Sequence, residues 1–285
     1  MKKIVLLTGL AGAGRTTAAD VLEDMGFYVI ENLPSSIIKD VVNGMNDKEG
    51  VRLAIAVDIR DQDSIKHVLQ ARESLEENGD DVDIVFLDAD DDTIIRRFEQ
   101  TRRPHPFISA GVLTKGIAIE RELLGDLLAN CDVHIDTTYT NPTQLAQKLS
   151  TLFSLEDKGT TVVVSSFGFK HGLPRDADFI FDVRFLPNPF WEPELKDMSG
   201  LEKKIQDYVK SYEKYDEYIS ALKTMLDVSI NEFQNLSKGF VTIAFGCTGG
   251  FHRSVTIADE IGNWLRSTGH KTIVIHRELD LSEQE

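Results

Sequence analysis

A glycine-rich segment near the start of the chain has residue types that can bind phosphate. It follows a short apolar run, precedes a helix-like segment, and reads Gly9-Leu10-Ala11-Gly12-Ala13-Gly14-Arg15-Thr16. This is the P-loop pattern G-x-x-x-x-G-K-S/T with arginine in the lysine position. Glycines let successive N–H groups point at one centre, and the following helix adds its partial positive charge. We therefore expect this loop to bind phosphate; the alternative is a glycine-rich turn without a ligand.

Side chains in and near this loop are candidates for catalysis and metal binding. Thr16 would offer its hydroxyl to Mg²⁺, and Asp88 ends the apolar run 84–87, at the edge of a predicted strand where ligands bind. Asp58 ends another apolar run and is a second candidate. The alternative role of Asp88 is a helix N-cap. Arg15 keeps the charge of the missing lysine, but its planar fork coordinates differently, so we expect binding with slow phosphoryl transfer.

A basic cluster follows Asp88 in a chain that is otherwise acidic. The chain has 31 Lys and Arg against 47 Asp and Glu, for a formal net charge of −16. The cluster consists of Arg96, Arg97, Arg102 and Arg103, with His105 after them. Guanidinium groups in this place are typical of a lid that meets phosphate oxygens. A solvated basic helix face and a patch that contacts RNA are the alternatives.

A second glycine-rich segment, residues 246–254, also lies between an apolar run and a helix-like segment. Cys247 and Arg253 stand in the C-x₅-R spacing that protein tyrosine phosphatases share. Three interpretations stay open: a phosphate-binding loop without covalent chemistry, a phosphatase, and a structural turn. The candidate residues of this anion site are Lys170, His171, Arg184, Cys247, Thr248, Gly249, Gly250, His252, Arg253 and Ser254.

The elements that must position these residues follow from the hydrophobic pattern. Short apolar runs of the first half, typical of strands buried in a parallel sheet, are residues 4–7, 53–57 and 84–87. Helix-like segments between and after them are 17–25, 35–44, 62–77, 93–101, 115–128 and 142–153. This alternation predicts an α/β domain with a parallel sheet.

The second half repeats the alternation after a polar stretch at 156–160, which we interpret as a linker. It has apolar runs at 161–165, 241–245 and 272–275, an aromatic- and proline-rich stretch at 179–193, and helix-like segments at 201–235 and 253–268. We therefore expect two domains: a phosphate-loop domain over 1–155, and an α/β domain with the second anion-binding loop over 160–285.

The number of cysteines and the lengths of the apolar runs indicate in which cellular compartment the protein resides. Two cysteines, Cys131 and Cys247, are too few for a disulfide framework. The apolar run 4–7 is too short for a signal peptide, and no stretch approaches the about 18 apolar residues of a membrane span. We expect a cytoplasmic protein with no membrane association. The oligomeric state stays open, a homo-oligomer included.

Taken together, these segments resemble the RapZ family of P-loop nucleotide-binding proteins. The resemblance spans nearly the whole chain and rests on residues 9–16, 22–28, 32–34, 58–60, 86–90, 101–106, 166–172, 181–189, 246–250 and 252–254. It implies a kinase-like N-terminal domain that binds ATP and GTP with Mg²⁺ and hydrolyses both weakly. It also implies a C-terminal domain that, in some bacteria, binds an amino-sugar phosphate and adapts small RNAs to a ribonuclease.

The resemblance assigns roles to particular residues. Residues 9–16 would be the ATP site, and the GTP segment would comprise Asp58, Ile59, Arg60 and Asp61. Four differences from the family pattern stand out. Arg15 replaces lysine, Asp61 stands where asparagine is usual, and Phe190 stands where His or Tyr is frequent. Residues 279–285 are acidic where RNA-binding members carry a basic tail, so tight RNA binding is not expected.

Two hypotheses from different classes follow. The first is an enzyme: a protein that binds ATP or GTP, hydrolyses it slowly and has a regulatory role. The second is a non-catalytic sensor that binds a phosphorylated amino sugar at the C-terminal loop and acts on a protein or small RNA partner.

Overall fold

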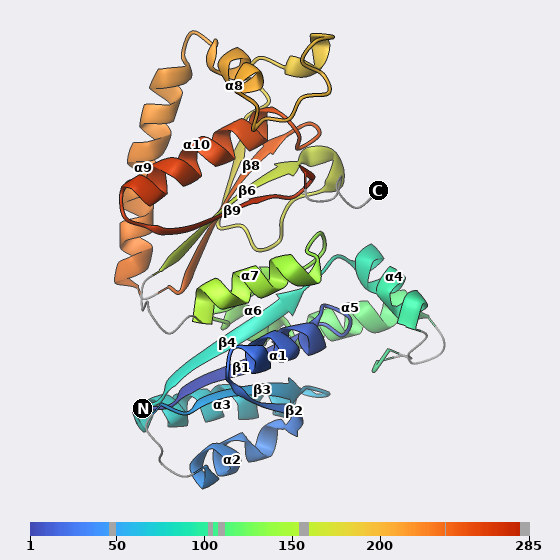
Figure 1. Cartoon of the computed structure of the whole chain (residues 1–285). Coiled ribbons are helices and arrows are strands. Elements are labelled where there is room, and N and C mark those ends of the chain that lie inside the picture. Colours follow the sequence, from blue (N-terminus) through green and yellow to red (C-terminus); the bar gives the residue numbers. More distant parts are fainter. Residues whose placement is uncertain (46–49, 102–104, 108–111, 154–159, 237, 280–285) are drawn as a thin grey trace. The chain divides into compact units, whose positions relative to one another are not determined.

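The structure is a computed structural model in which two compact units, Met1–Ser154 and Leu155–Glu285, can be described separately. It describes residues 1–45, 50–101, 105–107, 112–153, 160–236 and 238–279 (Figure 1). Several residues with predicted roles lie outside this description: Arg102, Arg103, most of the predicted linker (156–159) and most of the acidic end (280–285).

The first unit is built on a parallel sheet with the strand order β2-β3-β1-β4-β5 in its described part. The central strand β1 is buried almost throughout, because it pairs with β3 on one side and β4 on the other. The strands are β1 (Lys3–Gly9), β2 (Tyr28–Pro34), β3 (Arg52–Asp58), β4 (Asp81–Asp88) and β5 (Val133–Asp136).

Helices cover both faces of this sheet, as right-handed crossovers require for this strand order. Helix α1 packs against α7, while α3 packs against α2 and α6 (Figure 1). The helices are α1 (Arg15–Asp24), α2 (Ile38–Gly44), α3 (Gln62–Glu77), α4 (Asp91–Thr101), α5 (Leu113–Leu123), α6 (Gly125–Ala129) and α7 (Pro142–Phe153).

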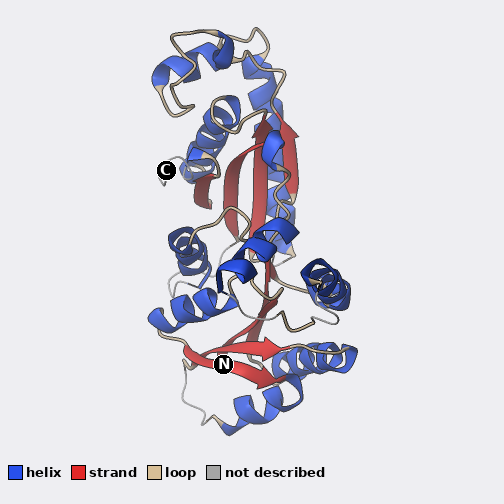
Figure 2. Ribbon diagram, turned by 90° about the vertical axis from the view of Figure 1, so that its right-hand side faces the viewer, coloured by secondary structure: helices blue, strands red, loops and turns tan. Residues whose placement is uncertain are grey.

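The second unit has its own parallel sheet with the order β7-β8-β6-β9 in the residues described there. Helix α10 packs along β6, β8 and β9, and Figure 2 shows this sheet with helices beside it. The elements are β6 (Thr161–Gly168), β7 (Phe179–Asp182), α8 (Lys203–Lys210), α9 (Tyr215–Asn235), β8 (Phe240–Cys247), α10 (Arg253–Ser267) and β9 (Lys271–His276).

The predicted α/β class with parallel sheets is confirmed, and α3 and α7 have the predicted bounds. Strands β2, β5 and β7 were not predicted. β2 is an edge strand with little apolar alternation, while β5 and β7 are only four residues each, too short for a periodic signal. No helix within the described ranges is long and apolar enough to cross a membrane.

Two segments were predicted as single helices, and these two predictions are wrong because each segment is interrupted. The segment 115–128 is interrupted at Leu124, which closes α5 before Gly125 begins α6. The segment 201–235 is interrupted after α8, where the Ser211 amide and hydroxyl both donate to the Tyr208 carbonyl, at 3.2 and 2.7 Å. A serine hydroxyl that donates to the carbonyl three residues earlier competes with continuation of the helix.

Candidate functional site

The first glycine-rich loop connects β1 to α1 at the carboxyl edge of the sheet. Gly9 has a φ of 131°, and a Cβ there would lie 2.1 Å from the Leu87 carbonyl oxygen, so only glycine fits. Gly14 is the N-cap of α1 with a φ of 98°, in the left-handed region. Within the described residues, no side chain caps α1. The N–H groups of Leu10, Ala11 and Ala13 donate within the protein, so an anion would bind at the loop's other N–H groups, beside the N-terminus of α1.

The loop's two predicted polar side chains have different surroundings. The Thr16 side chain is exposed in the first turn of α1. Arg15 is half-buried, and its Nη1 donates to the Val57 carbonyl at 3.3 Å. The guanidinium therefore lies beside the end of β3, one residue before Asp58.

Arg97 from the predicted lid reaches this loop, whereas Arg96 is exposed on α4 and its Nη2 donates to Thr93. Arg97 Nη1 donates to the Gly12 carbonyl at 2.9 Å and its Nη2 to the Thr137 carbonyl at 2.7 Å. The Thr137 hydroxyl donates to the Ala13 carbonyl at 2.9 Å. Sequence reasoning missed Thr137, because it follows the short strand β5 without any motif.

Glu120 on α5 is a second residue that sequence reasoning missed. Its side chain is 5% exposed, and its Oε2 accepts the Ala11 N–H at 3.0 Å. Burial raises the pKa of Glu120 to about 7, against the opposing effects of the Ala11 N–H and the Arg15 and Arg121 charges. The signal in the sequence was an acidic residue at helical spacing from Ile117 on an otherwise buried face.

Asp88, the predicted metal ligand, is engaged by an arginine that was not predicted. Its side chain is 3% exposed, and its Oδ1 accepts Arg121 Nη1 at 2.8 Å. Arg121 also binds Asp91 at 2.8 Å, which ties the end of β4 to the start of α4. Asp58, by contrast, is partly exposed and pairs with Arg60 Nε at 2.8 Å. The metal roles of Thr16 and Asp88 stay predictions.

The segment that the resemblance assigns to GTP has mixed surroundings. Ile59 is buried, and Asp61 is the N-cap of α3, where it accepts Ser64 N–H at 2.8 Å. This hydrogen bond, with that of the Ser64 hydroxyl, lowers the pKa of Asp61. Asp58, Arg60 and Asp61 line a pocket of about 320 Å³ together with Pro34, Ser35, Ser36, Asp63, Ser64 and His67.

A separate cavity of about 210 Å³ lies directly beside the first loop. Loop backbone and Arg97 form one side of it, and the turn after β5 forms the other. Its lining residues are Gly12, Ala13, Gly14, Thr17, Arg97, Thr137, Thr140, Asn141, Pro142 and Leu145.

In the second unit, the loops that follow β6 and β8 lie against each other at the carboxyl edge of the sheet. A Cβ on Gly168 would lie 2.6 Å from the Gly249 carbonyl carbon, so these backbones touch. The Lys170 N–H donates to the Thr248 carbonyl at 3.3 Å. Predicted residues from two distant segments, 170–171 and 247–254, are thereby brought to one place.

Arg253 is the buried charge of this second site, with 5% of the residue exposed. Its Nη1 donates to the carbonyls of Arg184 and Leu186, at 2.7 and 3.2 Å, and its Nη2 donates to Thr248 Oγ1 at 3.4 Å. Its Nε is buried and has no hydrogen-bond partner among the described residues. One donor of the guanidinium is thus left for a ligand or water.

Other predicted members of this site have structural partners. The Cys247 Sγ accepts the Gly250 N–H at 3.2 Å and lies 3.1 Å from Ser254 Oγ. His252 Nε2 lies 3.0 Å from the Lys196 carbonyl, and burial lowers its pKa. The Arg184 guanidinium is paired with Asp182 at 2.6 Å, and its charge also acts on Cys247 and Arg253. Its backbone carbonyl accepts from Arg253.

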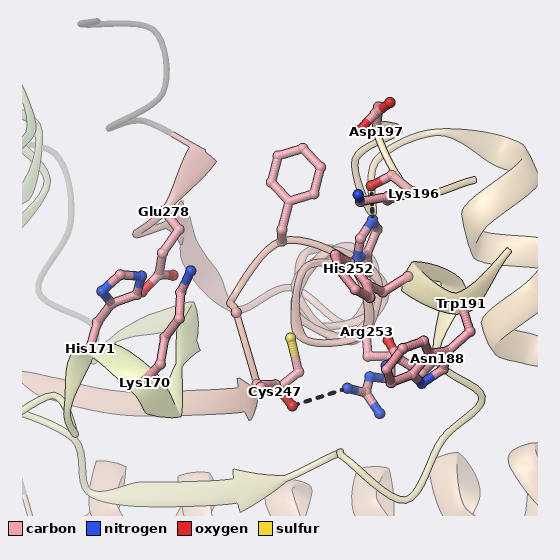
Figure 3. Close-up of a pocket in the computed structure, with 14 residues that line it drawn as sticks. Lys170, His171, Asn188, Trp191, Lys196, Asp197, Cys247, His252, Arg253 and Glu278 are labelled. Carbon is pink, nitrogen blue, oxygen red and sulfur yellow. Dashed lines mark hydrogen bonds between the residues drawn. The ribbon is translucent and has the colours of Figure 1, made fainter. Parts of the chain in front are cut away.

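Several loop residues, among them Cys247, His252 and Arg253, border a cavity of about 800 Å³ (Figure 3). Lys170, His171 and Glu278 stand on one side in Figure 3, with Arg253, Asn188 and Trp191 on the other. The remaining lining residues are Phe190, Lys196, Asp197, Cys247, Thr248, Gly249, Phe251 and His252.

Sequence reasoning missed Glu278, which lies close to the glycine loop. Its Oε1 accepts the Gly168 N–H at 3.0 Å, and a Cβ on Gly250 would lie 2.2 Å from its Oε2. That Oε2 is buried without a hydrogen-bond partner among the residues described. The other oxygen of this carboxylate, Oε1, also pairs with Arg277 Nε at 2.9 Å, so Oε2 is the oxygen left for a further donor.

Each of the two units matches a domain of a known protein family. The RapZ-like N-terminal domain matches residues 2–157, and the RapZ C-terminal domain matches residues 160–280. The chain belongs to the RapZ family. The RapZ resemblance, which rests on segments along nearly the whole chain, is therefore confirmed, and the RapZ match covers both glycine-rich loops.

Relatives of this RapZ-family chain include the nucleotide-binding protein PPA0813 of Cutibacterium acnes, 42% identical over 97% of this chain and 96% of that protein. A nucleotide-binding protein of Nocardioides sp. is 42% identical over 97% of this chain and 93% of its own length. Among solved structures, shikimate kinase from Acinetobacter baumannii aligns with a TM-score of 0.38 at 17% identity, over 55% of this chain and 96% of the kinase. That likeness is too distant to support a conclusion.

Proposed function

We propose that the first unit binds ATP or GTP with Mg²⁺ through residues 9–16, hydrolyses it slowly and has a regulatory role. The observation that carries the proposal is the loop itself, with glycines in left-handed conformation directly before α1. Arg97 at the loop and the cavity beside it supply a cationic group and space for the rest of a nucleotide. The two relatives named above are themselves called nucleotide-binding proteins.

Oxygen ligands at the loop fit a hard cation such as Mg²⁺. Thr16 offers an exposed hydroxyl, and Asp58 offers a partly exposed carboxylate beside Arg15. Asp88 would bind a cation either through Oδ2, which lies 3.6 Å from His134 Nε2, or by releasing Arg121 from Oδ1. When bound, Mg²⁺ would neutralise charge on the phosphate oxygens. Slow hydrolysis is consistent with an Arg15 guanidinium that bonds the end of β3.

Calorimetry with Gly14→Val tests this assignment. A β-branched residue strains the φ of 98° and blocks close approach of the phosphates, so ATP and GTP affinity should fall at least about 100-fold. Gly26→Val is the matched control, because Gly26 has a φ of 84° with nothing near its Cβ position. It should carry similar strain and bind nucleotide normally. Unchanged binding in Gly14→Val would reject the assignment.

A second candidate function is favoured by Glu278: the second unit senses a phosphorylated amino sugar and acts on a protein or RNA partner. Arg253 Nε is an unpaired donor suited to a phosphate, and Glu278 Oε2 is an unpaired acceptor suited to an ammonium group. Both residues line the same cavity of about 800 Å³. A ligand that carries both charges would satisfy both.

Two variants distinguish the contributions of Arg253 and Glu278 to ligand binding. Arg253→Ala should weaken binding of every sugar phosphate at least about 100-fold, because a buried charged donor is lost. Glu278→Gln should weaken an amino-sugar phosphate about tenfold and leave the matching neutral sugar phosphate unchanged. Calorimetry with both ligands measures this. An equal effect of Glu278→Gln on both sugars would exclude the ammonium contact.

A further inference from the structure

Glu120 is a buried carboxylate in direct contact with the phosphate loop, and the proposed nucleotide mechanism does not use it. Its Oε2 accepts the Ala11 N–H at 3.0 Å, across a sequence separation of 109 residues. A carboxylate at a loop N–H occupies the kind of position that a bound anion takes. Any polyphosphate held by this loop therefore has a negative side chain beside it.

His105 lies on the other side of the same oxygen. Its Nδ1 accepts the Phe107 N–H at 3.2 Å, which leaves the ring proton on Nε2, 3.2 Å from Glu120 Oε2. Nε2 makes no hydrogen bond within the described residues, and the ring is fully buried. Burial lowers the pKa of His105, so the imidazole is neutral at neutral pH and does not balance the carboxylate.

Helix α4 closes the space around Glu120 and His105. The Phe98 ring on α4 lies 5.0 Å from the His105 ring, and a Cβ on Gly12 would lie 3.0 Å from Phe98. Glu120 is thus enclosed between the loop, α4 and α5, where a charge is poorly solvated. The charged groups that act on it are Arg15 from α1 and Arg121 from α5.

We propose that Glu120 is a positioning residue that sets how tightly the loop binds phosphate, and that nucleotide binding adds a proton to it. Ionised Glu120 binds the Ala11 N–H and repels the polyphosphate, whereas protonated Glu120 keeps an acceptor oxygen for that N–H without the negative charge. This inference rests on the proposed nucleotide site at residues 9–16. It also links α5 to the loop, because Glu120 lies on α5 and bonds the Ala11 N–H.

The proposal predicts that the affinity for Mg-ATP decreases as the pH rises. Burial raises the pKa of Glu120 from 4.5 to about 7 in the free protein, and a bound polyphosphate raises it further. The Kd for Mg-ATP should therefore increase by up to about tenfold per pH unit above about pH 7. In that range His105 stays neutral and both arginines stay charged, so Glu120 is the group facing the loop that titrates.

Calorimetry on the full chain tests the proposal directly. Mg-ATP is titrated at about pH 7.5 in two buffers of different ionisation enthalpy, which yields the number of protons taken up. The unsubstituted protein should take up a substantial fraction of one proton. Glu120→Gln keeps an acceptor for the Ala11 N–H and should abolish both the uptake and the pH dependence. Glu122→Gln, on the exposed face of α5, is the control and should behave like the unsubstituted protein.

A nucleotide-free measurement separates the outcomes. Because the folded pKa of Glu120 lies above its unfolded value, its contribution to stability is present below pH 4.5 and is lost as pH rises through about 7. The stability of the unsubstituted protein minus that of Glu120→Gln should fall over this range. Nucleotide binding without proton uptake overturns this inference alone. Absence of nucleotide binding at every pH, with the stability difference intact, overturns the proposed function as well.

Discussion

The two glycine-rich loops share one plan but are held in different ways. Each leaves the carboxyl end of a buried parallel strand and enters a helix, β1 to α1 and β8 to α10. The first loop is held by distant side chains, Arg97, Thr137 and Glu120, which bond its backbone. The second loop has bonds among its own residues, Cys247 with Gly250 and Ser254. Its bonds to distant parts of the unit involve backbone groups, since Thr248 accepts the Lys170 N–H and Arg253 donates to the Arg184 and Leu186 carbonyls.

This difference separates a coupled site from a preorganised one. A loop bonded by α4, α5 and the turn after β5 changes its binding properties whenever those elements move or change charge. The second loop has bonds among its own residues in addition to its contacts with distant backbone, so we expect its shape to depend less on distant side chains and its affinity to depend more on the charges placed around it. We expect regulation to act through the first loop and ligand selection through the second.

The largest expected effect is on stability, at Gly9 of the first loop compared with Gly249 of the second. Gly9→Ala should lower the free energy of unfolding by about 4 kcal/mol, because its Cβ would lie 2.1 Å from the Leu87 carbonyl oxygen. Gly249→Ala should stay within about 0.5 kcal/mol, because its Cβ would meet nothing closer than Lys170 Cε at 3.9 Å. Urea denaturation of both variants measures the contrast. Similar losses in the two would mean that the loops are equally constrained.

An intermediate effect is expected at Arg15. Arg15→Lys should raise nucleotide hydrolysis about tenfold and change affinity by less than about threefold, because an ammonium can follow the γ-phosphoryl group into the transition state. Steady-state hydrolysis and calorimetry on one sample measure both quantities. Arg96→Lys, exposed on α4, is the control and should alter neither. Unchanged or lower turnover in Arg15→Lys would show that the site depends on arginine.

The smallest effect is expected at Cys247, the residue of the second loop that most resembles a nucleophile. Its thiol is buried and engaged by Gly250 and Ser254. Cys247→Ser should therefore change sugar-phosphate affinity by less than about 1 kcal/mol, since a hydroxyl can replace the thiol as a hydrogen-bonding group. Hydrolysis of a model phosphate ester that disappears in Cys247→Ser would instead identify a phosphatase.

Local patterns were sufficient to predict the class of fold and the place of both loops. Glycine spacing between an apolar run and a helix marks a loop such as residues 9–16, because φ preferences and helix N-termini are properties of a few adjacent residues. The bounds of α3 and α7 followed from apolar spacing for the same reason. Strands β2, β5 and β7 escaped detection because their patterns are weak or only four residues long.

The partners of the loops were decided by tertiary structure alone. Glu120 and Thr137 lie more than 100 residues from the loop that they bond, at separations of 109 and 124 residues, and Glu278 lies 110 residues from Gly168. No local pattern records such pairs, since strand order and helix packing determine which side chains meet. The sequence by itself determined where glycine-rich loops lead into helices. The fold decided which buried charges face it, because burial and distance set the energy of a charge.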